Sequence, residues 1–181
     1  MRKLFCIVLL LISYSAFAQK GGIPQIFIQP KIVLIGNAGA GIPFGPFGES
    51  HSFGIHGGLG GYFKVTDQVR LGGKLEENYF FGKMIPGYNQ RFDPENILRA
   101  VLSTVVRIPE STILLGADFG VAFSSSGGRS QTSLTYGVSA GIPFLGKLPV
   151  MASFWSAKRA SAARGELLFF FTPKILDPGD R

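Results

Sequence analysis

The segment Phe53–Val65, FGIHGGLGGYFKV, carries the pattern that decides the fold. Its odd positions hold Phe, Ile, Leu, Phe and Val together with two Gly, whereas its even positions hold only Gly, His, Tyr and Lys. Successive side chains of a β-strand point to opposite faces, so this alternation predicts a strand with one apolar face and one face of small or polar residues.

The same two-residue period recurs along the chain and predicts eight strands. They are expected at residues 31–44, 53–65, 69–81, 97–108, 112–123, 133–144, 148–157 and 166–175. Short turns at 66–68, 109–110 and 145–147 alternate with longer Gly-, Pro- and Ser-rich connections at 45–52, 82–96, 124–132 and 158–165. An even strand number with alternating short and long connections is typical of bacterial outer-membrane barrels. We therefore predict an all-β protein, an eight-stranded antiparallel up-and-down transmembrane β-barrel.

Composition excludes several other classes. The chain has 181 residues, of which 46% are apolar and 16% charged, with a net charge of +7. This balance excludes a disordered chain, and the length indicates one domain. The single Cys, Cys6, lies in a segment that we expect to be removed, so a disulfide framework and thiolate metal chemistry are excluded.

The first residues predict export. Met1–Lys3 is a short basic start, Leu4–Ile12 is an apolar run, and Ala16–Ala18 supplies small residues before Gln19. This order is typical of a cleaved secretory signal peptide, and the apolar run is too short for a membrane-spanning helix. We expect a signal peptide at 1–18, a short periplasmic segment at 19–30, the barrel at 31–175 and a tail at 176–181.

A signal peptide followed by eight alternating strands with Gly-rich lumen faces resembles the small eight-stranded bacterial outer-membrane β-barrel family, of the OmpA-barrel and OmpX type. The resemblance covers residues 31–175 and implies a location in the bacterial outer membrane. The closing strand of that family commonly ends the chain with an aromatic residue. Here the aromatics of Gly165–Phe171 are followed by Ile175–Arg181.

A soluble periplasmic barrel that binds an apolar ligand would show the same alternation, with its apolar face inward. The second face separates the two, because a solvent-exposed face should be densely charged. Here it is mostly Gly, Ser, Thr and Ala with single charges on each strand. This composition favours the lumen of a narrow membrane barrel.

Charged residues on the predicted lumen face form the first candidate site: Lys74, Glu76, Arg99, Asp118 and Glu166. Eight strands leave an interior only wide enough for side chains, so we expect these residues to pair and fill the lumen. The alternative is a narrow channel for ions or small solutes, in which the same charges would set selectivity.

Aromatic residues gather near the predicted strand ends. We expect them to form two interfacial girdles, with Phe44, Phe53, Phe81, Phe123, Phe154 and Trp155 at the outer rim and Phe63 and Phe144 at the inner rim.

The predicted outer loops carry an excess of basic residues: Lys83, Arg91, Arg129, Lys158, Arg159 and Arg164. These side chains suit contacts with outer-membrane lipid, including lipopolysaccharide phosphates, or with an envelope protein partner. We expect no nucleic-acid binding, because the chain is exported and carries no binding motif.

A lipid-modifying enzyme remains an alternative, because Glu49, Ser50, His51 and Ser52 lie together at the predicted outer rim. A catalytic triad needs hydrogen bonds between its members, which sequence proximity does not supply. No metal, phosphate-loop or dinucleotide signature is present, so no cofactor is expected. We expect a non-enzymatic structural or interaction protein that acts through its external loops.

Overall fold

The structure is a computed structural model that describes residues 31–144 and 148–171. The expected signal peptide at 1–18, the segment 19–30 and the tail 176–181 lie outside the described residues, as do the last residues of the predicted barrel, 172–175.

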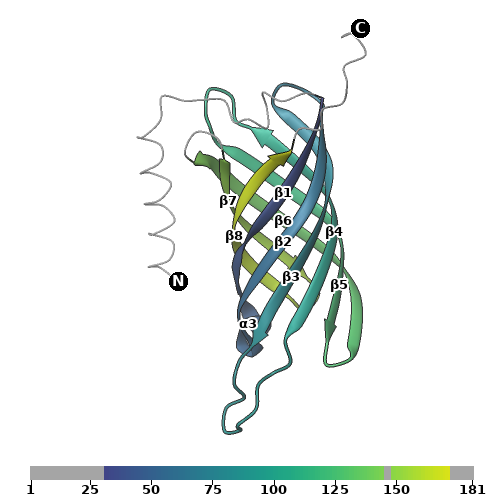
Figure 1. Ribbon diagram of the computed structural model, residues 1–181, viewed down its shortest axis with the longest axis vertical. Coiled ribbons are helices and arrows are strands. Elements are labelled where there is room, and N and C mark those ends of the chain that lie inside the picture. Colours follow the sequence, from purple (N-terminus) through teal and green to yellow (C-terminus); the bar gives the residue numbers. More distant parts are fainter. Residues whose placement is uncertain (1–30, 145–147, 172–181) are drawn as a thin grey trace.

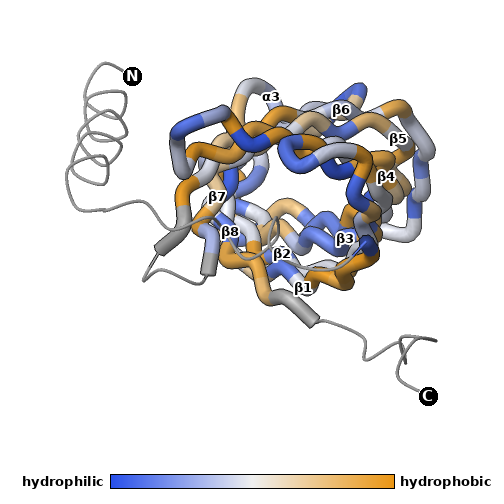
Figure 2. The backbone as a smooth tube through the Cα atoms, turned by 90° about the horizontal axis from the view of Figure 1, so that it is seen from above, coloured by the Kyte–Doolittle hydropathy of each residue, from blue (hydrophilic) through white to orange (hydrophobic). Residues whose placement is uncertain are grey.

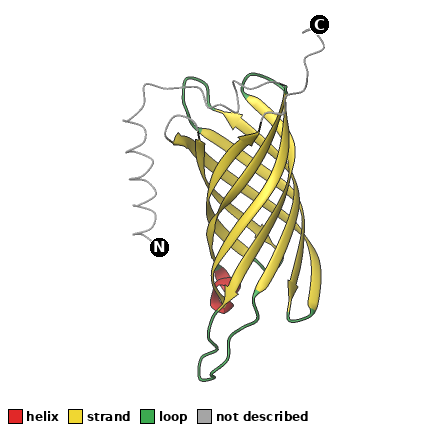
Figure 3. Cartoon of the chain, in the orientation of Figure 1, coloured by secondary structure: helices red, strands yellow, loops and turns green. Residues whose placement is uncertain are grey.

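The described chain is a closed barrel (Figures 1 and 3). Its strands are β1 (Ile32–Pro43), β2 (His51–Lys64), β3 (Val69–Gly82), β4 (Glu95–Arg107), β5 (Leu114–Ser126), β6 (Arg129–Phe144), β7 (Leu148–Ala157) and β8 (Ser161–Phe171). Each strand pairs antiparallel with the next, and β1 pairs with β8 to close the ring. The predicted eight-stranded antiparallel up-and-down barrel is confirmed. A short helix, α3 (Gly45–Ser50), connects β1 to β2, and no helix among the described residues is long and apolar enough to cross a membrane.

The alternation in sequence becomes a division between the inside and the outside of the barrel. Figure 2 shows hydrophobic and hydrophilic residues alternating along the strands around the closed ring. Large apolar side chains stand on the outer wall, and Leu59 and Leu102 are 70% and 74% exposed. Charged side chains such as Glu76 and Arg99 have no exposed surface. The apolar face is therefore the outer one, which excludes the arrangement of a soluble barrel around an apolar ligand.

The two ends of the barrel differ. The terminal end, where β1 begins and β8 ends, carries the turns at 65–68 and 108–113. The opposite end, which we call the loop end, carries α3 and the connection at 83–94, which extends furthest from the strands in Figure 1.

Two connections predicted to be long are tight hairpins at the loop end. Strands β5 and β6 are joined by Gly127 and Gly128 alone, with φ angles of 53° and 75°. Positive φ at both central residues is the requirement of a type I′ turn, which only residues such as Gly adopt without strain. The serine-rich residues around this turn continue the ladder, as in the pair Ser126–Arg129. Likewise, β8 begins at Ser161 rather than near residue 166.

The lumen is filled in three layers. A terminal-end apolar layer consists of Val33, Ile35, Tyr62, Val105, Leu114, Met151 and Leu168. A loop-end apolar layer consists of Phe47, Phe80, Ile97, Ala122, Trp155, Ala160 and Ala162. Between these two layers, near the middle of the strands, lie the charged residues Lys74, Glu76, Arg99, Asp118, Arg164 and Glu166. The buried Arg70, at the start of β3, lies at the terminal end.

Candidate functional site

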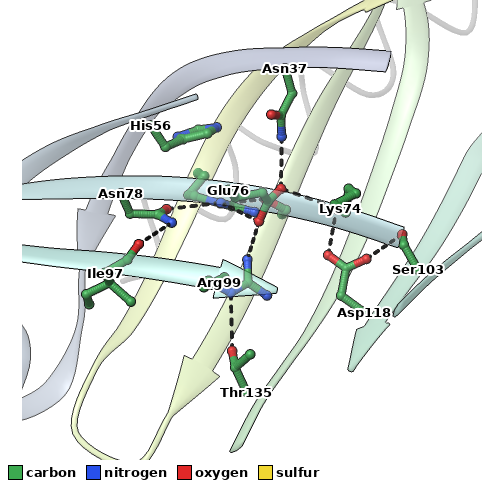
Figure 4. A network of polar contacts seen from close by, with 12 residues as sticks. Asn37, His56, Lys74, Glu76, Asn78, Ile97, Arg99, Ser103, Asp118 and Thr135 are labelled. Carbon is green, nitrogen blue, oxygen red and sulfur yellow. Dashed lines mark hydrogen bonds and ion pairs between the residues drawn. The ribbon is translucent and has the colours of Figure 1, made fainter. Parts of the chain in front are cut away.

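Glu76 of β3 is the centre of the lumen network (Figure 4). Its Oε2 accepts hydrogen bonds from Arg99 Nη1 at 2.6 Å and from Arg164 Nη1 at 3.2 Å. Its Oε1 accepts a hydrogen bond from Asn37 Nδ2 at 2.9 Å and lies 3.3 Å from Lys74 Nζ. A fully buried carboxylate needs such compensation, and three cations surround this one.

Lys74 links this centre to a second carboxylate. Its Nζ lies 2.8 Å from Asp118 Oδ2, while Asp118 Oδ1 accepts a hydrogen bond from Ser103 Oγ at 2.6 Å. The hydroxyl of Tyr62 in turn donates to Ser103 Oγ at 2.7 Å. This chain of bonds connects the charged layer to the terminal-end apolar layer, to which Tyr62 belongs.

Glu166 of β8 is the third carboxylate of the network. Its Oε2 accepts a hydrogen bond from Asn37 Nδ2 at 2.9 Å and lies 3.8 Å from His56 Nε2. Both side chains of this histidine–glutamate pair are almost fully buried. The single amide of Asn37 therefore bridges Glu76 and Glu166, and so joins β3 to β8 through β1.

The structure thus brings together all five predicted lumen charges: Lys74, Glu76, Arg99, Asp118 and Glu166. With Arg164 the network holds three cationic and three anionic side chains. Five of these six side chains form ion pairs with one another, and Glu166 bonds to Asn37 and lies close to His56. This balance of opposite charges lets them be packed in the lumen.

Arg164 was predicted to lie in an outer loop, and this placement is wrong. It belongs to β8 and is 4% exposed. It donates from Nε to Ser153 Oγ at 3.2 Å and from Nη1 to Asn78 Oδ1 at 3.1 Å, besides its bond to Glu76. Because β8 begins earlier than the alternation indicated, residue 164 falls on a lumen-facing position. The residues that precede it in β8 are Ser161, Ala162 and Ala163, which are all small and show no clear alternation between apolar and polar positions.

The loop-end apolar layer stacks against the charged network. The guanidinium carbon of Arg99 lies 4.9 Å from the centre of the Trp155 ring, a cation–π distance. Arg99 Nε also donates to Thr135 Oγ1 at 3.2 Å. Trp155 was predicted for the outer girdle, but it is fully buried and faces the lumen. Successive side chains of a strand point to opposite faces, and on β7 the outward position belongs to the neighbouring Phe154.

The other predicted girdle residues lie mainly on the outer wall. Exposed fractions between 39% and 51% are found for Phe44, Phe53, Phe63, Phe123 and Phe154. Phe81 is half-buried and stacks on Phe53 with ring centres 4.6 Å apart. Phe144 ends β6, and its side chain lies outside the described residues.

The remaining predicted basic residues are exposed at the loop end: Lys83, Arg91, Arg129, Lys158 and Arg159. Lys158 and Arg159 form the turn between β7 and β8, where Ala157 and Ala160 exchange backbone hydrogen bonds of 2.7 and 3.2 Å. The Lys83 ammonium donates to the carbonyl of Gly48 in α3. This contact holds the long connection at 83–94 against the helix.

His51, the candidate base of the enzyme hypothesis, begins β2 and is 5% exposed. Its Nδ1 lies 2.8 Å from Ser50 Oγ, and its ring centre lies 4.4 Å from that of Phe47. Among the described residues, no carboxylate bonds to this imidazole, so the Ser–His pair lacks the orienting acid of a triad. In the same part of the chain, no group of three or more His, Cys, Asp or Glu side chains could hold a metal ion.

No protein-family model matches the sequence, and no curated protein matches it. The barrel is nevertheless similar to solved structures. The outer membrane protein Ail of Yersinia pestis, in a phospholipid bilayer nanodisc, matches with a TM-score of 0.56 at 15% identity, covering 77% of this chain and 99% of that one. Neisserial surface protein A matches with a TM-score of 0.54 at 12% identity, over 79% and 97% of the two chains.

A third similar structure is the N-terminal β-barrel domain of Pseudomonas aeruginosa OprF, with a TM-score of 0.51 at 16% identity over 78% of this chain and 98% of that domain. These likenesses define the class. The chain has the fold of the small eight-stranded outer-membrane β-barrels, with a closed ring of strands and an apolar outer wall.

Proposed function

We propose that the protein is an integral protein of the bacterial outer membrane with a sealed lumen, and that it has a structural or interaction role at its loop end. One observation carries this proposal. The outer wall exposes large apolar side chains such as Leu59, Leu102 and Phe119, while charged residues are paired inside. A wall of this kind is costly in water and favourable against lipid.

The packing of the lumen supports a plug rather than a channel. Six charged side chains occupy the centre, five of them in ion pairs and the sixth, Glu166, bonded to Asn37, and an apolar layer covers them at each end. A cavity between Asn37, Tyr62, Lys74 and Glu166 has a volume of about 20 Å³, which is room for one water molecule. Conduction requires a continuous path of weak sites for the ion, and this packing offers none through the described lumen.

A non-enzymatic role agrees with the geometry at the rim. The hydroxyl of Ser50 has a hydrogen bond to the Phe47 carbonyl at 3.2 Å as well as its contact with His51 Nδ1. A serine that donates to a backbone carbonyl is not activated by the imidazole beside it. Contacts with outer-membrane lipid, lipopolysaccharide included, or with an envelope protein are the role that we assign to the exposed cations of the loop end.

Membrane insertion and closure can be tested together. The full chain is expressed with its N-terminal segment, outer membranes are isolated, and unboiled and boiled samples are compared on detergent gels. We expect the protein in the outer-membrane fraction, with a mobility shift on boiling. A chain that stays in solution without detergent and shows no shift would overturn the proposal. Planar-bilayer recordings of the purified barrel should show no steady conductance, whereas stable single-channel steps would support the channel instead.

A further inference from the structure

A hollow at the loop end, which we call the rim pocket, lies between α3 and the β7–β8 turn. Its volume is about 680 Å³, within the range of small-molecule sites. Its polar lining includes Ser50, His51, Ser156, Lys158, Arg159 and Ser161. Glu95 is the one acidic side chain in the lining, so the two cations leave the pocket with net positive charge.

His51 brings an unsatisfied ring nitrogen to this pocket. Ser50 Oγ lies 3.2 Å from the Phe47 carbonyl, which can only accept, so its single hydroxyl proton is directed there. The 2.8 Å contact with His51 is then a bond that Nδ1–H donates to Ser50 Oγ. This leaves Nε2 as the free nitrogen, buried and without a hydrogen-bond partner among the described residues. A buried polar atom without a partner needs an explanation, and a ligand in the rim pocket would supply one.

The outer wall has a groove of about 830 Å³, next to the rim pocket on the side of the terminal end. Its floor is a row of small outward-facing residues in register across four strands, namely Ala40, Gly165, Ala152 and Ala140. All four are exposed. Next to this row, toward the rim, lies the parallel row of Ile42, Ala163, Phe154 and Val138.

The rim pocket and the wall groove are continuous, because Phe44 and Phe154 line both. Polarity falls steadily along this path. Lys158 and Arg159 stand at the tip, and the hydroxyls of Ser156 and Ser161, 2.9 Å apart, come next. Apolar side chains follow down the wall. This order matches an amphiphile that lies along the barrel with its anionic head at the rim.

We infer that the rim pocket and the wall groove together bind one membrane lipid with a phosphorylated headgroup. Lys158 and Arg159 bind the phosphate, and an acyl chain lies in the groove over Gly165. His51 Nε2, which carries no proton when Nδ1 donates to Ser50, accepts a hydrogen bond from a hydroxyl of the headgroup. Nε2 is buried in this structure, so this bond requires a shift of the side chains that pack against His51, such as Phe47, whose ring centre lies 4.4 Å from that of the imidazole. The inference rests on the proposed function, because the groove must face the membrane.

The test uses the two histidines of the chain, His51 and His56. The protein is produced with ¹³C-labelled histidine and purified in octyl glucoside micelles. It is then titrated separately with dihexanoyl phosphatidic acid, with dihexanoyl glycerol and with inorganic phosphate, and the NMR signals of the two histidine rings are recorded. His51→Gln assigns the two signals. We expect phosphatidic acid to move the His51 signal saturably, while the signal of His56, which lies in the sealed network, stays in place. Phosphate alone and the uncharged glycerol lipid should each bind about tenfold more weakly or worse, since each keeps only part of the contacts.

Matched variants separate the groove from the pocket. A Cβ at Gly165 meets open space, so Gly165→Leu fills the groove without disturbing the barrel. We expect it to weaken phosphatidic acid about tenfold and to leave phosphate binding unchanged, since the headgroup contacts remain. Gly73→Leu on β3 is the control, since its Cβ would make only an ordinary contact of 3.5 Å with the Val101 carbonyl.

In the pocket, Lys158→Gln with Arg159→Gln should weaken both anionic ligands, and Arg129→Gln is the exposed control. A His51 signal that ignores phosphatidic acid would overturn the inference, as would an equal shift at His56. Equal responses to phosphate and phosphatidic acid, unaffected by Gly165→Leu, would replace the lipid with a free anion. Each variant is first checked for the heat-dependent gel shift, so failure of the lipid site is distinguished from failure of the barrel.

Discussion

Arg164 of β8 donates a hydrogen bond from Nη1 to Glu76 Oε2 of β3 at 3.2 Å, across the lumen and between residues 88 positions apart. The same oxygen accepts from Arg99 of β4 at 2.6 Å. One carboxylate oxygen therefore connects strands on different sides of the ring, at a place where Glu76 and Arg99 have no exposed surface.

Removing the charge of Glu76 should cost more stability than any other single change in the network. In Glu76→Gln, Arg99 and Arg164 stay buried but lose their shared anion, and breaking a buried pair in this way costs about 3–5 kcal/mol. We expect a lower free energy of unfolding in urea and a lower temperature for the gel shift. Glu77→Gln is the matched control, because Glu77 is exposed on the outer wall and bonds to Asn96 at 2.7 Å. Equal losses in the two variants would contradict the central role of Glu76.

Lys74 and Asp118 should show energetic coupling. Lys74→Met leaves the Asp118 carboxylate with only the bond from Ser103, so we expect a loss of about 2–4 kcal/mol. Adding Asp118→Asn removes the carboxylate charge that has lost its cation, and it should restore part of the lost free energy of unfolding. A double-mutant cycle in urea measures the coupling. Strictly additive losses would show that the two side chains do not act as a pair.

The inward position of Trp155 predicts its fluorescence behaviour. It is the single Trp of the chain and is fully buried in the lumen. In bilayers that contain brominated lipids, its emission should be only weakly quenched. The variant that combines Trp155→Phe with Phe154→Trp moves the indole by one residue to the outer wall, and we expect strong quenching. Strong quenching in the unchanged protein would place Trp155 in the girdle after all.

The hairpin between β5 and β6 should depend on the left-handed backbone of Gly128. A Cβ added there meets nothing within 4 Å, so a substitution tests the backbone alone. With φ at 75°, Gly128→Ala should lose about 1–2 kcal/mol, whereas Gly128→Asn should lose less because Asn tolerates this conformation. Urea unfolding of the two variants is the measurement. Equal losses would argue against a type I′ turn.

At the terminal end, the hydrogen bond and charge of the Lys64 ammonium hold the pKa of the Asp67 carboxyl below its usual range. A lowered pKa means that the contact stabilises the turn above the ordinary carboxylate pKa and loses its effect as the pH falls through the folded-state value. In Lys64→Gln the pKa of Asp67 should rise toward its ordinary value. Carboxyl ¹³C NMR measures it, and Glu110→Gln in the neighbouring turn should leave it unchanged.

The sequence allowed prediction of the strands whose two faces differ strongly. Around Phe53–Val65, bulky and small residues alternate, and the structure confirms a strand there. The lumen charges follow from the same alternation, because a position on a strand fixes the side of the wall. The pairing partners do not follow, since they depend on the register between strands far apart in sequence.

Prediction failed where alternation is weak or where turn chemistry decides. The early start of β8 lies in a run of Ser and Ala, which carries little contrast between the two faces of the strand. The prediction therefore placed Arg164 in a loop and not in the lumen. The β5–β6 hairpin was hidden because Ser and Gly are typical of both long loops and tight turns. Trp155 was assigned to the girdle by its residue type alone, although Phe154 beside it occupies the outward position.

The pairing of β1 with β8 has a consequence for assembly. The last strand brings both Arg164 and Glu166, so the interior charges are matched only when the ring closes. Before that moment, Glu76 and Arg99 face an open gap and keep their hydration. Closure thus expels the remaining water from the interior at the same time as it completes the ladder. A chain that stops short of β8 would retain a wet, open-sided sheet, which makes completion of synthesis a condition for a stable product.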